Sequence, residues 1–205
     1  MRQIPDFIKL MWRTPVWRIN PSEKVIYLTF DDGPNPEVTP RVLDILDEFE
    51  AKATFFCVGE NVMKYPEIFQ EVKHRGHAVG NHTFNHVKGT EKTVKEYVDN
   101  VGKAHEYIHS KLFRPPHGRI TLSQVNKLKA DFKIIMWDFI TYDFDRQVTS
   151  TEILKEVKIR SRNGSVVIFH DSLKARKNVL EALPEALRYW KKEGYEVKAL
   201  HELTH

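Results

Sequence analysis

Short apolar runs alternate with amphipathic segments along most of the chain. The first run, residues 25–30, is apolar or β-branched at every position, which is typical of a strand buried on both faces. Runs of the same kind recur between clusters of turn residues. The pattern predicts seven strands, at residues 25–30, 53–58, 77–80, 112–114, 133–138, 165–169 and 195–200.

Between these runs, apolar residues recur at the spacing of a helix that is buried along one face. In residues 39–50 this stripe follows Thr39 and Pro40, which we expect as the N-cap and the first helical residue. Pro184 interrupts the last helical segment and predicts a kink or two shorter pieces. The predicted helices are residues 39–50, 66–76, 93–110, 121–130, 149–161 and 179–192.

Strands alternating with helices indicate an α/β protein built from βα units, with a parallel sheet or barrel of about seven strands. We expect one domain over residues 23–205, preceded by an N-terminal arm over residues 1–22. The arm contains Trp12 and Trp17 among basic residues. We expect it to pack on the barrel, with a helix lying on a membrane surface as the alternative.

Composition excludes several classes of protein. With 41% hydrophobic and 29% charged residues in 205, the chain is typical of a folded globular protein. The net charge of +4 is spread along the chain without a basic block, so no nucleic-acid partner is expected. The single cysteine, Cys57, excludes an internal disulfide.

Targeting signals are also lacking in the pattern. No apolar run reaches the length of a transmembrane helix or of the apolar core of a signal peptide. We therefore expect a cytoplasmic protein unless a leader has been removed. The sequence leaves the oligomeric state open.

Polar side chains gather where the predicted strands end. In parallel α/β folds the carboxyl ends of the strands carry the chemistry, so these residues are expected to converge. Each residue alone has an ordinary structural explanation, and the joint pattern carries the argument. The residues are Asp31 and Asp32, His82 and His86, Arg114 and His117, Trp137, Asp138, Asp143 and Phe144, and His170 and Asp171.

Two histidines and one carboxylate form a common ligand set for a divalent metal with open positions for water. His82 and His86 directly follow a strand, in a short turn where both imidazoles can face one point. One of the adjacent Asp31 and Asp32 can complete the set, and the metal charge would remove the repulsion between them. The other aspartate would be free to act as a base on a metal-bound water.

Five segments together resemble the polysaccharide deacetylases, which form carbohydrate esterase family 4. They read TFDDGP, HTFNH, RPPHG, a Trp–Asp region and IFHDS, and they occur in the family's order. The resemblance covers most of the span from residue 25 to residue 200. It implies a distorted (β/α) barrel with about seven parallel strands and a catalytic domain over residues 23–205.

The resemblance also implies roles for individual residues. Asp31 corresponds to the catalytic base and Arg114 to the residue that orients it. Asp32, His82 and His86 correspond to the metal ligands. The metal expected is one Zn²⁺, with Co²⁺, Mn²⁺ or Ni²⁺ as alternatives.

A second group of residues corresponds to the acid and to the substrate pocket. His170 matches the catalytic acid, Asp143 the carboxylate that tunes it, and the backbone N–H of His117 the oxyanion donor. The implied reaction is hydrolysis of an N-acetyl group on an amino-sugar polymer such as peptidoglycan or chitin-type oligomers. The walls of the acetyl pocket would be formed by Trp137, Phe144 and Ile168.

The fourth motif departs from the family pattern, which commonly reads Asp-x-x-Asp-Trp. Ile140 replaces the first acid of this motif, and Phe144 replaces its tryptophan. These changes affect the shape of the pocket and the preference for substrate.

Three alternatives stay open at the level of sequence. The scaffold could hydrolyse another amide, a cyclic imide, a ureide or an O-acetyl ester. It could be an inactive carbohydrate-binding protein, against which the presence of both Asp31 and His170 argues. A mononuclear iron oxygenase shares the ligand set but not the additional base and acid.

Overall fold

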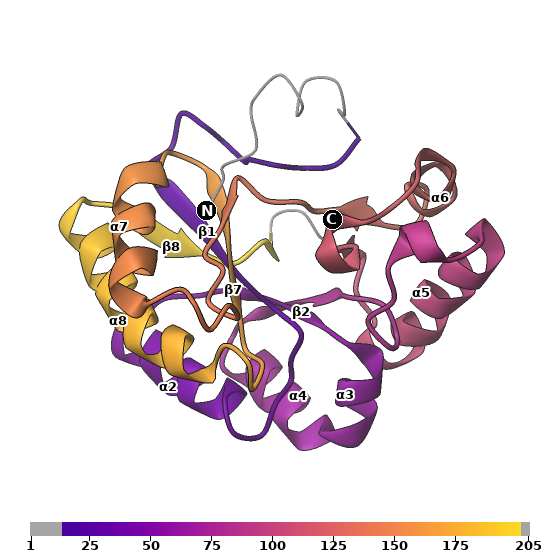
Figure 1. Ribbon diagram of the computed structural model, residues 1–205, viewed down its shortest axis with the longest axis horizontal. Helices are drawn as coiled ribbons and strands as arrows, with labels where there is room; N and C mark the ends of the chain where they lie inside the picture. Colours follow the sequence, from indigo (N-terminus) through magenta and orange to yellow (C-terminus); the bar gives the residue numbers. More distant parts are fainter. Residues whose placement is uncertain (1–13, 202–205) are drawn as a thin grey trace.

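The computed structural model describes residues 14–201. Its eight strands form one sheet in the order β5-β4-β3-β2-β1-β7-β6, with β8 pairing beside the first half of β1. All strand pairs are parallel, and the sheet curls into a distorted barrel with helices on the outside (Figure 1). The strands are β1 (Val25–Asp31), β2 (Thr54–Cys57), β3 (Ala78–Asn81), β4 (Leu112–Phe113), β5 (Lys133–Ile134), β6 (Phe139–Ile140), β7 (Ser165–His170) and β8 (Glu196–Lys198). This confirms the predicted α/β class.

Helices connect successive strands, as expected for βα units. The helices are α2 (Thr39–Glu48), α3 (Gly59–Lys64), α4 (Pro66–His74), α5 (Val94–Ile108), α6 (Leu122–Leu128), α7 (Ser150–Arg160) and α8 (Arg176–Lys192), with 3₁₀ turns η1 (Gly89–Glu91) and η2 (Pro116–Gly118). Capping boxes begin three of them, at Thr93, Thr121 and Thr149. These three starts are therefore specified locally in the sequence.

Three details of the helices differ from the sequence prediction. The N-cap of α2 is Val38, because the hydroxyl of Thr39 is engaged elsewhere, as described below. Helix α3 was not predicted. Helix α8 continues through Pro184 as one element and does not divide into two pieces.

The central strand β1 places alternate side chains on opposite faces of the sheet. Ile26, Leu28 and Phe30 belong to the main core. On the other face, Tyr27 lies in the cluster inside the barrel, and Thr29 and Asp31 continue that row. The same alternation in β7 brings His170 to the inner face, where it pairs in register with Asp31. The strand pattern therefore delivers both side chains to the same end of the barrel.

The predicted strand at residues 133–138 is shorter than expected, since β5 ends at Ile134, and a further strand that was not predicted, β6, follows at Phe139–Ile140. Ile134 pairs with β4, whereas Phe139 pairs with β7, at the opposite edge of the sheet. Residues 135–138 thus join the two edges of the open sheet. The sequence did not show where β5 ends, because residues 134–137 are apolar without a break.

Residues 16–19 cover this seam, and we call them the strap. Val16 forms a parallel bridge with Ile135, and Arg18 an antiparallel bridge with Ser165. Figure 1 shows this N-terminal segment crossing one side of the barrel before it enters β1. Residues 1–13, which include Trp12 and on which the membrane-surface alternative partly depends, lie outside the described residues. No helix within residues 14–201 is both long enough and apolar enough to cross a membrane.

Candidate active site

A cavity of about 350 Å³ opens at the carboxyl ends of the strands. Arg114 and Asp143, two further residues singled out in the sequence, lie behind its wall and contact its lining residues. The structure therefore brings together all eleven residues to which the family resemblance gives a role. The lining is Asp31, Asp32, His82, His86, Pro115, His117, Trp137, Ile140, Tyr142, Phe144, Ile168, His170 and Lys174.

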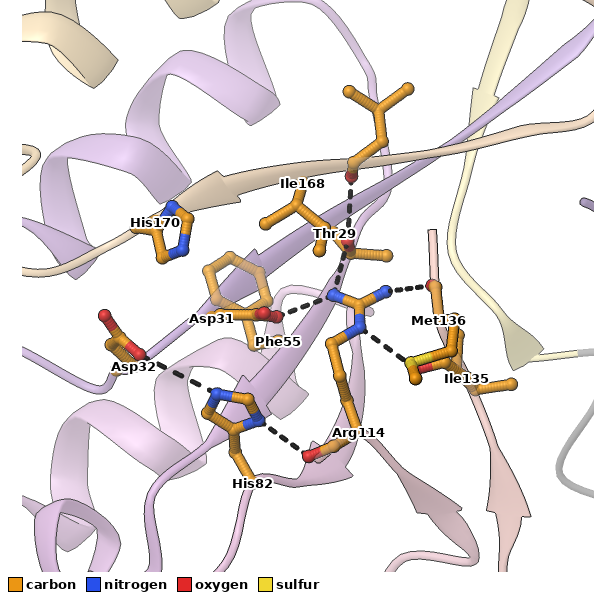
Figure 2. A network of polar contacts seen from close by, with 12 residues as sticks. Thr29, Asp31, Asp32, Phe55, His82, Arg114, Ile135, Met136, Ile168 and His170 are labelled. Carbon is orange, nitrogen blue, oxygen red and sulfur yellow. Dashed lines mark hydrogen bonds and ion pairs between the residues drawn. The ribbon is translucent and has the colours of Figure 1, made fainter. Parts of the chain in front are cut away.

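The two adjacent aspartates have different partners. Asp31 accepts a hydrogen bond of 2.6 Å from Nη1 of Arg114 (Figure 2). The guanidinium of Arg114 is fully buried and also donates to Thr29 Oγ1 at 2.8 Å. Its Nε donates to the backbone carbonyl of Ile135 at 3.3 Å, and its Nη2 donates to that of Met136 at 3.0 Å. Arg114 is therefore held at several points, and it fixes the carboxylate of Asp31.

Asp32 faces the two histidines instead. Its Oδ1 lies 3.1 Å from Nε2 of His86 and 3.7 Å from Nε2 of His82. Nδ1 of His82 donates to the carbonyl of Arg114 at 2.8 Å, which leaves Nε2 unprotonated and directed at Asp32 (Figure 2). Burial lowers the pKa of His82 to about 4, so the ring is neutral at pH 7, as a metal ligand must be.

These three side chains fit a divalent metal. One ligand atom from each of Asp32, His82 and His86 lies within 4.8 Å of the others, and this is the one such group within residues 14–201. Burial opposes the charge of Asp32, but a hydrogen bond from His86 and the nearby imidazoles lower its pKa, so a carboxylate is present. A set of two imidazoles and one carboxylate suits zinc and similar ions and leaves positions open for water and substrate.

Asp32→Ala should weaken metal binding more than any change outside this cluster. We expect the metal affinity to fall by at least about 10- to 100-fold, because mutating residues that merely hydrogen-bond to a metal ligand already has an effect of this size. Titration calorimetry on metal-stripped protein would measure it. The exposed aspartate Asp99 of α5 provides a matched control, since Asp99→Ala should leave the affinity unchanged. Equal affinities in Asp32→Ala and the wild type would exclude the cluster as the metal site.

A further buried acid holds the loop that carries Asp32. Asp171 accepts hydrogen bonds from the backbone N–H of Gly33 at 2.9 Å and from the hydroxyl of Thr39 at 2.6 Å. A Cβ at position 33 would lie 2.0 Å from Asp171 Oδ2, so only glycine allows this approach. Burial raises the pKa of Asp171 to about 7. The positioning role of Asp171 was not predicted, because these contacts join residues more than 130 positions apart.

His170 is oriented by Asp143 on the opposite side of the cavity. The carboxylate of Asp143 accepts from the backbone N–H of His170 at 2.8 Å and contacts its Nδ1 at 2.7 Å. Nδ1 therefore carries a proton, and Nε2 is left for the cavity. Burial opposes the charged form, but Asp143 outweighs it and raises the pKa of His170 to about 9. His170 is consequently protonated near neutral pH and can donate a proton.

Asp143→Asn should move the alkaline limb of the activity profile to lower pH. His170 donates only when protonated, so its raised pKa sets the upper end of the active range. Removing the neighbouring charge lowers that pKa, by about 1 to 3 units for a close opposite charge. The pH dependence of kcat would measure this shift. An alkaline limb at the wild-type position would show that Asp143 does not tune the acid.

Apolar and aromatic side chains form the remaining wall of the cavity. Trp137, Phe144 and Ile168 lie in it, as the sequence predicted, and the Phe144 ring packs edge-on against His170 with 4.7 Å between centroids. The imidazole ring of His117 packs against that of His86, with 4.7 Å between the ring centroids. Pro115, Tyr142 and Lys174 also line the cavity, although no role was assigned to any of them from the sequence. One predicted strand-end acid, Asp138, lies outside it, because Arg162 and Ser165 bind its carboxylate.

Backbone strain concentrates at this site. The φ angle is positive at five non-glycine residues on the loops that carry it, a conformation that costs energy and occurs where the surrounding structure enforces it. Such residues are common at sites of binding and catalysis. They are Asp32 (83°), Thr83 (66°), His86 (58°), His117 (56°) and Tyr142 (57°).

Known proteins are similar to this chain in sequence and in fold. A peptidoglycan-N-acetylglucosamine deacetylase of Bacillus cereus is 34% identical over 194 residues, which is 91% of either chain. A chitooligosaccharide deacetylase of Azorhizobium caulinodans is 32% identical over 75% of this chain and 77% of its own length. The solved structure of a peptidoglycan N-acetylglucosamine deacetylase superposes with a TM-score of 0.90 at 29% identity, covering 96% of this chain and 95% of that one.

A family 4 pseudoenzyme of Bacillus anthracis also superposes, with a TM-score of 0.83 at 27% identity over 93% of this chain and 69% of that one. The fold alone therefore does not decide activity, and the site must be considered with it. A family model for polysaccharide deacetylases matches residues 18–132, more than half of the chain. With this match, the similarity to the Bacillus cereus enzyme and the Asp–His–His cluster in place, the chain belongs to the polysaccharide deacetylase family.

Proposed function

We propose that this protein is a metal-dependent N-deacetylase that releases acetate from an N-acetylated amino-sugar polymer, such as peptidoglycan or chitin-type oligomers. One observation carries the proposal. A carboxylate held by a buried arginine, Asp31, and an imidazole held by a carboxylate, His170, face one cavity that also contains the metal cluster. Two relatives of similar length are named as a peptidoglycan-N-acetylglucosamine deacetylase and a chitooligosaccharide deacetylase, which supports this substrate class.

Attack by water depends on the metal ligands and on the base Asp31. Asp32, His82 and His86 would hold a divalent metal, which when bound would supply Lewis-acid chemistry to water and to the acetamide carbonyl. Asp31 accepts a proton from the attacking water. Arg114 keeps the Asp31 carboxylate fixed, so that little reorganisation is needed when the proton moves.

His170 completes the reaction at the leaving group. An amine leaves poorly from carbon unless it is protonated, and Nε2 of His170 can donate that proton. Asp143 stabilises the imidazolium before transfer. The C–N bond breaks, and the products are acetate and the free amino sugar. The apolar wall formed by Trp137, Phe144 and Ile168 suits the acetyl methyl group.

Zinc is the metal we propose for this cluster, with Co²⁺, Mn²⁺ and Ni²⁺ as competitors. Imidazole and carboxylate ligands bind all four ions, and Zn²⁺ binds more tightly than Mn²⁺ or Co²⁺ in most such sites. Metal analysis of protein purified without chelators should find about one ion per chain, as one three-residue cluster holds one metal.

A screen of acetate release tests the function directly. The substrates are N-acetylglucosamine oligomers, peptidoglycan fragments, acetylated xylan and a cyclic imide, each with several divalent metals. We expect acetate and new primary amines in equal amounts from the first two. Metal-loaded Asp31→Asn protein is the matched control for contaminating activity. Release from acetylated xylan alone, or ring opening of the imide alone, would overturn the proposal in favour of an esterase or an imidase.

A further inference from the structure

The strap, residues 16–19, is built into the seam of the barrel on both sides. On one side, the backbone of Val16 donates to Ile134 and accepts from Met136, both at 2.8 Å. On the other, the N–H of Ile19 donates to the carbonyl of Gly164 at 2.9 Å. A Cβ at position 164 would lie 1.8 Å from the carbonyl oxygen of Ile19, and φ there is +73°. Only glycine at position 164 therefore allows the backbone of the strap to approach this closely.

The backbone that the strap holds is also the backbone that holds Arg114. The carbonyls of Ile135 and Met136 accept from the guanidinium, while the N–H of Met136 donates to Val16. Ile135 and Met136 lie between β5 and β6 and belong to neither strand. Hydrogen bonds from Ile135 to β4 and from Met136 to the strap fix its two consecutive residues. The strap therefore determines where one of the acceptors for Arg114 lies.

From Arg114 the chain of contacts reaches the reacting groups. The guanidinium packs over the ring of Phe56 at 4.0 Å and donates to Asp31 at 2.6 Å. Figure 2 shows Arg114 between the Ile135–Met136 backbone on one side and Asp31 on the other. Because Arg114 is fully buried, a displaced carbonyl cannot be replaced by bulk water without moving the side chain.

We propose that the strap is a positioning element of the active site, which sets the place of the base Asp31 through Met136 and Arg114. Trp17 anchors it, since this side chain is 7% exposed and belongs to the cluster around Phe113, Ile134 and Met136. Residues 16–19, which the sequence places in the N-terminal arm, would then belong functionally to the catalytic domain. The inference rests on the proposed role of Asp31.

Val16→Pro tests it, because proline removes the N–H that binds Ile134. We expect exchange of the Arg114 Nε proton, followed by NMR on metal-free protein, to accelerate by about 10-fold or more. We also expect kcat to fall on the order of 10-fold, the effect of a small displacement of a reacting group. KM and metal affinity should stay within about twofold, because the metal ligands lie on other segments. The control Val16→Ala keeps both backbone hydrogen bonds of residue 16, so its proton exchange, kcat, KM and metal affinity should equal those of the wild type.

Two further variants separate positioning from a general loss of stability. Val72→Ala removes two methyl groups from the main core in α4, a helix that packs on β3 and α2, and should lower Tm without changing kcat or the exchange of Arg114. Trp17→Leu loosens the anchor while leaving the backbone intact, and it should shift exchange and kcat in the same direction as Val16→Pro.

Wild-type exchange of the Arg114 Nε proton in both strap variants would overturn the inference. A fall in kcat of equal size in Val72→Ala would also overturn it. The exchange measurement needs no substrate, so it tests the strap even if the wild-type protein releases no acetate, a result that would instead overturn the proposed function.

Discussion

His170→Ala should slow hydrolysis of N-acetyl substrates by about 10²- to 10⁴-fold, the usual contribution of a positioned general acid. The reason lies in the leaving group. An amine must receive a proton as the C–N bond breaks, and Nε2 of His170 faces the cavity with a proton that Asp143 helps to retain.

An activated aryl acetate provides the internal control for this variant. Its phenolate leaves without protonation, so the same His170→Ala protein should lose much less activity on it. The ratio of the two losses is the quantity to measure, at saturating metal, because it cancels any change in the amount of folded protein. Equal losses on the amide and the aryl ester would contradict the assignment of His170 as the acid.

Asp31→Asn should abolish most turnover while the protein still binds metal. Asparagine has the shape of aspartate but cannot accept a proton from water at neutral pH, so a loss of about 10²- to 10⁴-fold is expected. The metal ligands Asp32, His82 and His86 remain in place. The change also leaves the buried Arg114 without its charged partner, and such losses cost about 3 to 5 kcal/mol. We therefore expect a lower Tm in addition to the loss of activity.

Comparison with Asp32→Ala separates the two aspartates. Calorimetric titration should find near wild-type metal affinity in Asp31→Asn and a large loss in Asp32→Ala. Metal at several times the dissociation constant should not restore turnover in Asp31→Asn, because its defect lies in proton transfer. If both variants lose metal to the same extent, the roles of base and ligand are wrongly assigned.

The sequence by itself determined the elements and the end of the barrel where the chemistry lies. Apolar runs and helical periodicity located seven of the eight strands approximately and six of the seven helices. These features are local, since a capping box such as Thr93 with Glu96 spans one helical turn. The convergence of Asp31, His82, Arg114 and His170 followed from one rule, that parallel strands end at the same edge.

Only the tertiary structure decided how these residues are held. Asp171 binds Gly33 across 138 positions, and the strap binds Met136 across more than 100, so no local pattern signals either contact. The division of residues 133–140 into β5 and β6 arose in the same way, because each strand pairs with a different neighbour. Side-chain chemistry is encoded residue by residue, whereas the backbone carbonyls that fix Arg114 are present in every residue and acquire a role only through their place in the fold.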